Sequence, residues 1–155
     1  MVVQEGTTLQ HCDELSPRLR QHDLEELLAS RPGLAPEVIL KECVQVSAKT
    51  FSVISEEVGC VAIFGVRTSG DQGIPWMLSS EYLFEKAPRR FIRECRYYVE
   101  ELTKDYSHSF NWVSVSNLKA QAWLEWLGFT VNRGNPITHN GVTFYPFSKV
   151  RIKDV

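Results

Sequence analysis

The sequence predicts an α+β fold, with helices flanking a mixed β-sheet, in one domain over residues 1–155. Apolar residues recur at helical spacing in the first third and in two later segments. Segments rich in β-branched and aromatic residues lie between them, and no repeat or low-complexity tract interrupts this order. A chain of 155 residues with 43% hydrophobic residues can bury a core without disulfides or a structural metal.

The first third is predicted to be mainly helical. Residues 2–3 suit a short edge strand, and a helical segment follows over residues 9–30 with a break near Ser16-Pro17. The breaker at residues 31–33 ends that segment, and Pro36 suits the first turn of the next helix.

The middle of the chain has a strand-like pattern. Residues 51–53 and 60–66 are rich in β-branched and aromatic side chains on either side of a turn at 56–59, which predicts a hairpin. A second turn-like stretch leads into a short buried strand at 74–79, with Pro75 at its entrance.

Two strong helices and the last strands complete the order. One helix opens at Pro88 with apolar residues along one face, and a strand at 110–115 follows it. Asn117 is placed to cap the second helix, and Gly128 is placed to stop it. The chain closes with two predicted strands, at 129–131 and 142–150.

The net charge and the composition limit the classes of partner that we expect. With 17 Lys and Arg against 19 Asp and Glu, the net charge is -2, so we do not expect nucleic acid as a partner. The four cysteines are scattered without a C-x-x-C motif, and the four histidines have no adjacent nucleophile, which predicts reduced thiols and no metal site. No long apolar run and no signal pattern is present, so we expect no membrane partner and a cytoplasmic protein.

A segment near the carboxyl end resembles a known signature. Residues 117–129 combine an asparagine, a small residue, two apolar positions and a final Gly-Phe. This segment resembles the carboxyl-side signature of the GCN5-related N-acetyltransferase (GNAT) family. Residues 60–66, 75–78, 88–91 and Asn111, in this order, also resemble the acetyltransferase-like proteins of tailed bacteriophages, some of which are internal virion proteins. The match covers residues 24–150 and rests on short motifs.

The resemblance implies a fold, a ligand and a location. The sheet would be mostly antiparallel with one parallel split pair, formed by strands 76–79 and 110–115. The pantetheine arm of acetyl-CoA, a CoA thioester, would lie in that split. A phage protein would act in the host-cell cytoplasm or lie inside the virion, with a host or virion protein as a further partner.

The residues expected to touch the ligand lie where these two strands end. The resemblance implies that the backbone N–H groups of Met77 and Leu78, together with Ser79 and Asn117, contact the pantetheine arm. The Asn117 amide can both cap a helix and reach a ligand.

Acetyl transfer also needs a base that deprotonates the amine. Glu81, just past the strand, is the nearest carboxylate and is the predicted catalytic residue. Glu56 and Glu57 at the hairpin turn are the alternatives, and an ordinary exposed acid is the competing interpretation of each.

Two features depart from the family pattern. Typical members follow the fourth strand with a glycine-rich phosphate loop, but this chain has no glycine between Gly73 and Gly128. Members often carry a tyrosine seven residues after the asparagine, where it protonates the leaving thiolate. Here that position is Leu124.

Arginines at the start of the helix after residue 88 compensate in part for the missing glycine-rich phosphate loop. Arg89, Arg90 and Arg93 lie where the helix macrodipole disfavours cations, and a bound CoA phosphate would relieve that conflict. A solvated basic face is the alternative interpretation. Arg90 is also spaced to pair with Glu94 at i, i+4.

Two functions therefore stay open at the level of sequence. The first is a phage-encoded GNAT-type N-acetyltransferase that acts on an amine of a protein or small molecule. The second is an inactive phage protein of the same fold that serves as a virion component or binds a host protein. The missing glycines and Leu124 favour the second, whereas Asn117 and the arginines favour the first.

Overall fold

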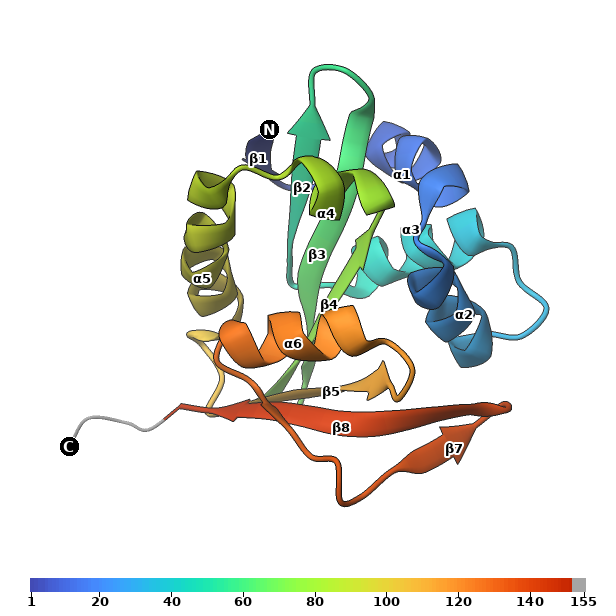
Figure 1. Cartoon of the computed structure of the whole chain (residues 1–155), viewed down its shortest axis with the longest axis vertical. Coiled ribbons are helices and arrows are strands. Elements are labelled where there is room, and N and C mark those ends of the chain that lie inside the picture. The colour runs from blue at the N-terminus through green and yellow to red at the C-terminus, as the bar shows by residue number, and fades with distance from the viewer. Residues whose placement is uncertain (152–155) are drawn as a thin grey trace.

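A twisted open sheet with helices on both faces forms the computed structural model, which describes residues 1–151 (Figure 1). Its strand order is β1-β2-β3-β4-β5-β8-β6, with β7 paired to β8. Every pairing is antiparallel except that of β4 with β5. The predicted α+β class and its mixed sheet are confirmed.

The strands and helices have the following bounds. The strands are β1 (Val2–Glu5), β2 (Lys49–Ser55), β3 (Gly59–Ser69), β4 (Gln72–Ser79), β5 (His108–Ser114), β6 (Thr130–Val131), β7 (Ile137–His139) and β8 (Val142–Val150). The helices are α1 (Leu9–Leu15), the 3-10 turn η1 (Ser16–Arg18), α2 (Gln21–Ser30), α3 (Pro36–Val46), α4 (Glu81–Lys86), α5 (Arg89–Thr103) and α6 (Leu118–Trp126).

Most predicted elements are present, with three differences. The break in the first helical segment falls at Pro17 in η1, as predicted. Pro75 lies inside β4 rather than at its entrance, opposite Val66 of β3. Helix α4 occupies a stretch in which no helix was expected, and β7 is a three-residue strand too short to give a periodic signal.

Two buried apolar clusters lie on opposite faces of the sheet. Helices α5 and α6 cover one cluster, which includes Phe64, Phe91, Leu102, Phe129 and Phe147. Helices α1, α2 and α3 cover the other cluster, which includes Leu15, Leu27, Ile39, Leu40 and Leu78. Because side chains of β4 alternate between the faces, Met77 packs with the first cluster and Trp76 and Leu78 with the second.

Within residues 1–151, no helix combines the length and the apolar character needed to cross a membrane. In the same part of the chain, no group of His, Cys, Asp and Glu side chains is arranged to hold a metal ion.

Candidate functional site

Strands β4 and β5 start as a parallel pair and then separate. Their register contains only two residue pairs, Gln72 with His108 and Gly73 with Ser109. Pro75 follows on β4, and because it has no N–H it cannot extend the ladder toward β5. We call the widening gap beyond this point the fork.

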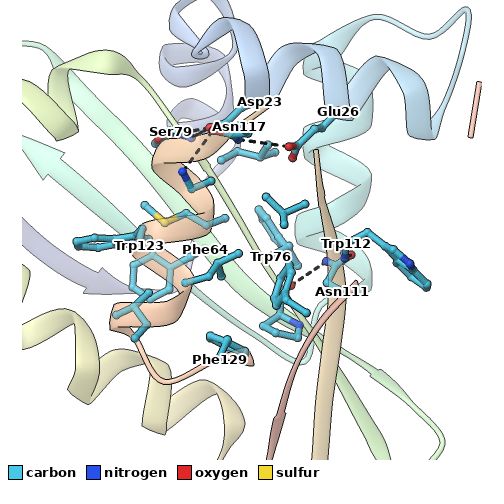
Figure 2. A pocket seen from close by; sticks show the side chains of 18 of the residues that line it. Asp23, Glu26, Phe64, Trp76, Ser79, Asn111, Trp112, Asn117, Trp123 and Phe129 are labelled. Atoms are coloured by element: carbon cyan, nitrogen blue, oxygen red, sulfur yellow. Dashed lines mark hydrogen bonds between the residues drawn. The ribbon is translucent and has the colours of Figure 1, made fainter. Parts of the chain in front are cut away.

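A side chain replaces the backbone ladder where the fork opens. Asn111 of β5 donates from Nδ2 to the Pro75 carbonyl at 2.8 Å, and its Oδ1 accepts the Trp112 N–H at 2.8 Å (Figure 2). This amide therefore ties the two strands together at one point without closing the gap above it.

Met77 presents its backbone to the fork. The Ser80 N–H donates to the Val61 carbonyl of β3 at 2.9 Å, whereas the Ser79 N–H points away from β3. Because backbone groups alternate along a strand, the N–H and C=O of Met77 face the fork like those of Ser79. The Leu78 amide, by the same alternation, faces β3 instead.

Helix α2 spans the open end of the fork with two carboxylates one helical turn apart. Asp23 Oδ2 accepts the N–H of Ser79, the last residue of β4, at 3.0 Å. Glu26 Oε1 accepts the N–H of Ser114, the last residue of β5, at 2.8 Å. Each separated strand end is thus bound by one acidic side chain of the same helix.

Arg20 is the buried cation of this cluster, and 4% of its side chain is exposed. Its guanidinium donates to Glu81 Oε1 at 3.2 Å, to Asn117 Oδ1 at 3.4 Å and to Asp23 Oδ1 at 3.5 Å. The same group lies over the Phe84 ring, 4.5 Å from its centre. Arg20 therefore joins α2, α4 and the start of α6.

Asn117 caps α6, as predicted. Its Oδ1 accepts the Ala120 N–H at 3.3 Å, and its Nδ2 donates to Glu26 Oε1 at 3.3 Å. The side chain is fully buried, so it positions the Glu26 carboxylate at the strand ends while it caps the helix.

The Glu26 carboxyl has the protonation behaviour of a general base. Burial raises its pKa to about 7, although the hydrogen bonds from Ser114 and Asn117 oppose that change. Burial also raises the pKa of Asp23, although the hydrogen bond from the Ser79 N–H and the charge of Arg20 act to lower it. No residue within 1–151 donates a hydrogen bond to Glu26 Oε2, which leaves that oxygen available to a ligand.

A cavity of about 560 Å³ runs through the fork. One part lies between α5, α6 and the sheet and is lined mainly by aromatic and aliphatic side chains, as Phe64, Trp123 and Phe129 show in Figure 2. The cavity is partly open to solvent, so it is a cleft rather than a void within the core. Its volume lies within the range of ligand sites, which favours a binding cavity.

The predicted site residues divide into two groups. Met77, Leu78, Ser79 and Asn117 all line the cavity. Glu81 lies outside the lining with 52% of its side chain exposed, where it pairs with Arg20 and, at 4.0 Å, with Lys119.

The arginines also lie outside the cavity lining. Arg89, Arg90 and Arg93 are exposed on the first turns of α5, and Arg90 pairs with Glu94 at 3.0 Å, as predicted. Pro88 is the N-cap of α5 and provides no side-chain cap, so the first N–H groups of the helix have no side-chain partner at that position.

The structure shows what occupies the two positions at which the sequence departs from the family pattern. Helix α4 fills the stretch after β4 in which the family carries its glycine-rich phosphate loop. Leu124 lines the cavity, so an alkyl side chain stands where the family often has a phenol.

The sequence interpretation missed Arg20, Asp23 and Glu26. A usable signal existed, because Asp23 and Glu26 lie at i, i+3 and share a helix face with the buried Leu27. Acidic residues on an otherwise apolar face indicate a buried polar cluster.

Comparison with solved structures identifies the fold. The chain is similar to an aminoglycoside 6'-acetyltransferase type Ii, with a TM-score of 0.68, 16% identity and full coverage of both chains. It is similar to a GNAT-family acetyltransferase from Bacillus anthracis, with a TM-score of 0.64, 11% identity, and coverage of 96% of this chain and 93% of that one. A Bacillus subtilis acetyltransferase in complex with CoA gives a TM-score of 0.63 at 9% identity, with 97% and 98% coverage.

The chain therefore has the fold of the GNAT acetyltransferases. No protein-family model and no curated protein sequence matches it.

Proposed function

We propose that this chain is an N-acetyltransferase that moves the acetyl group of acetyl-CoA to an amine of a protein or small molecule. The observation that carries the proposal is the fork, in which the Met77 backbone faces a ligand-sized cavity between separated strands. The fold likeness to acetyltransferases, one of them solved in complex with CoA, supports it.

The residues of the fork suit a pantetheine arm. Met77 offers an N–H and a C=O that can bond the amides of such an arm as a neighbouring strand would. The apolar lining contributed by Met77, Trp123 and Leu124 suits its methylene and methyl groups. When bound, acetyl-CoA would supply a thioester: the C–N bond to the amine would form as the C–S bond breaks, the amine would lose one proton, and the CoA thiolate would take one up.

Arg89, Arg90 and Arg93, at the start of α5, would hold the phosphates. They offer charge and several N–H donors at a helix N-terminus, in place of the glycine-rich loop that α4 replaces. Their exposure suits a phosphate group that stays partly solvated.

Glu26 is the general base that the geometry favours over Glu81. Its carboxylate lines the cavity at the open end of the fork, and its pKa of about 7 lets it take up a proton at neutral pH. Glu81 faces Arg20 and solvent, and its predicted role as the base is the competing proposal.

An inactive protein of the same fold, acting as a virion component or host-protein ligand, is the second candidate. Helix α4 in place of the phosphate loop and Leu124 in the cavity favour it. A phage origin, with action in the host cytoplasm or inside the virion, rests on the sequence resemblance and remains a prediction.

A matched pair of alanines on α6 tests ligand binding. Ala120 lines the cavity, whereas Ala122 is exposed on the same helix. We expect acetyl-CoA to raise the melting temperature of the wild type and of Ala122→Trp, and to leave Ala120→Trp unchanged because the indole fills the cavity. No shift for the wild type at millimolar acetyl-CoA would refute the proposal.

Three carboxamide variants assign the base. Glu26→Gln should lower kcat by about 10²–10⁴-fold without changing the acetyl-CoA affinity. Glu25→Gln, on the exposed side of α2, is the control and should keep its activity. Loss of activity in Glu81→Gln with full activity in Glu26→Gln would reverse the assignment, and acetyl-CoA binding without turnover by the wild type would support the inactive candidate.

A further inference from the structure

The cavity continues through the fork onto the α2 face of the sheet, where its walls are aromatic. Trp76 packs with the apolar cluster of that face, and its Nε1 donates to Ser47 Oγ at 2.8 Å, which fixes the ring. Val113 packs on the opposite face, so its neighbour Trp112 points to the α2 side, where it lines the cavity. Trp112 is 40% exposed.

A third apolar wall comes from the hairpin of β7 and β8. Ile137 of β7 lines the cavity and is partly exposed to solvent. Asn140, at the hairpin turn, donates from Nδ2 to the Ala29 carbonyl at 2.7 Å, which holds the hairpin against the end of α2. We call this space, bounded by Trp76, Trp112 and Ile137, the outer chamber.

Few charged side chains line the cavity as a whole. In the part of the chain that the structure describes, the charged or titratable groups among the cavity-lining side chains, thiols and phenols aside, are Arg20, Asp23, Glu26 and His139. Arg20 and Asp23 pair with each other, and His139 Nε2 lies 3.1 Å from Asn140 Nδ2. Glu26 Oε2 is therefore the carboxylate oxygen available to a cation in the chamber.

We propose that the outer chamber binds the acceptor, and that the acceptor is a monoamine with an aromatic or alkyl group. Its ammonium would bind Glu26 Oε2, and its apolar group would lie against Trp76, Trp112 and Ile137. This inference rests on the proposed function, because it assigns the opposite part of the cavity to the CoA thioester.

The outer chamber disfavours amines that carry more than one positive charge. A polyamine or aminoglycoside carries several cations, and here a second cation would meet apolar walls and the Arg20 guanidinium rather than another free carboxylate. An apolar group on the amine is stabilised when it leaves water for indole and alkyl surface. The single available carboxylate oxygen and the apolar walls together favour apolar monoamines.

Direct binding tests this class. We would titrate 2-phenylethylamine, n-hexylamine, spermidine and a lysine-containing tetrapeptide into the full-length protein by calorimetry, with and without CoA. We expect the two apolar monoamines to bind at least about tenfold more tightly than spermidine or the peptide. Equal or tighter binding of spermidine or the peptide would overturn the assignment.

Two variants and a matched control locate the site. Trp112→Ala should weaken hexylamine and phenylethylamine by about tenfold or more, whereas Tyr97→Ala, which removes an exposed aromatic ring on α5, should leave them unchanged. Ile137→Glu adds a second carboxylate to the chamber and should raise spermidine affinity relative to hexylamine. Unchanged amine affinity in both chamber variants would place the amine elsewhere.

The acetyl-CoA titration separates this inference from the proposed function. Trp112→Ala should keep the wild-type affinity for acetyl-CoA. If the wild type binds acetyl-CoA but not the apolar amines, the acceptor inference fails and the proposed function stands. If it binds the amines but not acetyl-CoA, the proposed function fails, and with it the acceptor role of the chamber.

Discussion

Two parts of the cavity wall have opposite character, and they are stabilised differently. Between α5 and α6, the walls are aromatic and aliphatic residues that belong to the main apolar cluster. At the open end of the fork, the wall is a buried polar cluster built around Arg20, Asp23, Glu26 and Asn117. The apolar part is stabilised by the burial of apolar area, and the polar part by the hydrogen bonds and the ion pair among its side chains.

This difference shows where the fold is vulnerable. An apolar wall tolerates a smaller side chain at a graded cost, because its neighbours relax in part. Removal of one partner of a buried ion pair is strongly destabilising, because the remaining charge stays desolvated without a counter-charge. The separated ends of β4 and β5 have no ladder between them, so they depend on the polar cluster.

The largest effect is expected from Arg20→Met. This change leaves the buried Asp23 carboxyl without its ion-pair partner, and it should lower the free energy of unfolding by about 4 kcal/mol at pH 7.5. Urea denaturation would measure it, with Arg31→Met as the control, since the Arg31–Glu42 pair is exposed and should contribute less than about 1 kcal/mol. Equal losses in the two variants would show that the polar cluster does not hold the fork.

The apolar part was largely predictable from sequence, and the polar part was not. The helical spacing of Phe91, Cys95 and Leu102 indicates which face of α5 is buried without reference to any other segment. Arg20, by contrast, meets Glu81 and Asn117, which lie 61 and 97 positions away. Such contacts depend on how the elements pack, which no local pattern contains.

The fork itself illustrates the same limit. The sequence marks Pro75 as a strand-limiting residue, but whether it begins a strand or interrupts a parallel pair depends on β5, which follows more than 30 residues later. Asn117 is predictable as a cap because capping is local, whereas its contact with Glu26 is not predictable from local sequence. The sequence favours Glu81 because it directly follows β4, while Glu26 reaches the same strand ends from another helix.

The second prediction concerns pH. The pKa of Glu26 is raised from 4.5 to about 7 in the folded protein, so the folded state holds a proton more tightly than the unfolded chain. The stability that this group contributes is complete below about pH 4.5 and is lost as the pH rises through about 7, a total on the order of 3 kcal/mol. Glu26→Gln should remove this loss.

Unfolding measured from pH 4.5 to pH 8 tests this linkage. The stability of Glu26→Gln relative to wild type should increase with pH over that window, and Glu25→Gln should follow the wild type throughout. A parallel pH profile for wild type and Glu26→Gln would mean that Glu26 is not buried as a protonated acid.

The third prediction addresses the apolar part. Leu102 is buried on α5 and already borders the cavity, so Leu102→Ala removes fewer contacts than in a fully packed core. We expect a loss of about 2 kcal/mol, the lower end of the range for such changes, with no dependence on pH between 4.5 and 8. Leu118→Ala, at an exposed position of α6, is the control. A loss of stability that varies with pH would mean that the apolar wall and the polar cluster are energetically coupled.

The smallest effect is expected at the closed end of the fork. Asn111→Ala removes the donor to the Pro75 carbonyl and the acceptor of the Trp112 N–H, but both groups border the cavity, where water can replace the amide. The expected loss is about 1 kcal/mol by urea denaturation. Asn132→Ala, which removes a similar bond to the exposed Gly134 N–H, should cost less than about 1 kcal/mol. Should Asn111→Ala instead destabilise the protein as much as Arg20→Met, the strands would be held mainly where they converge, and α2 would only cover a gap that the sheet already maintains.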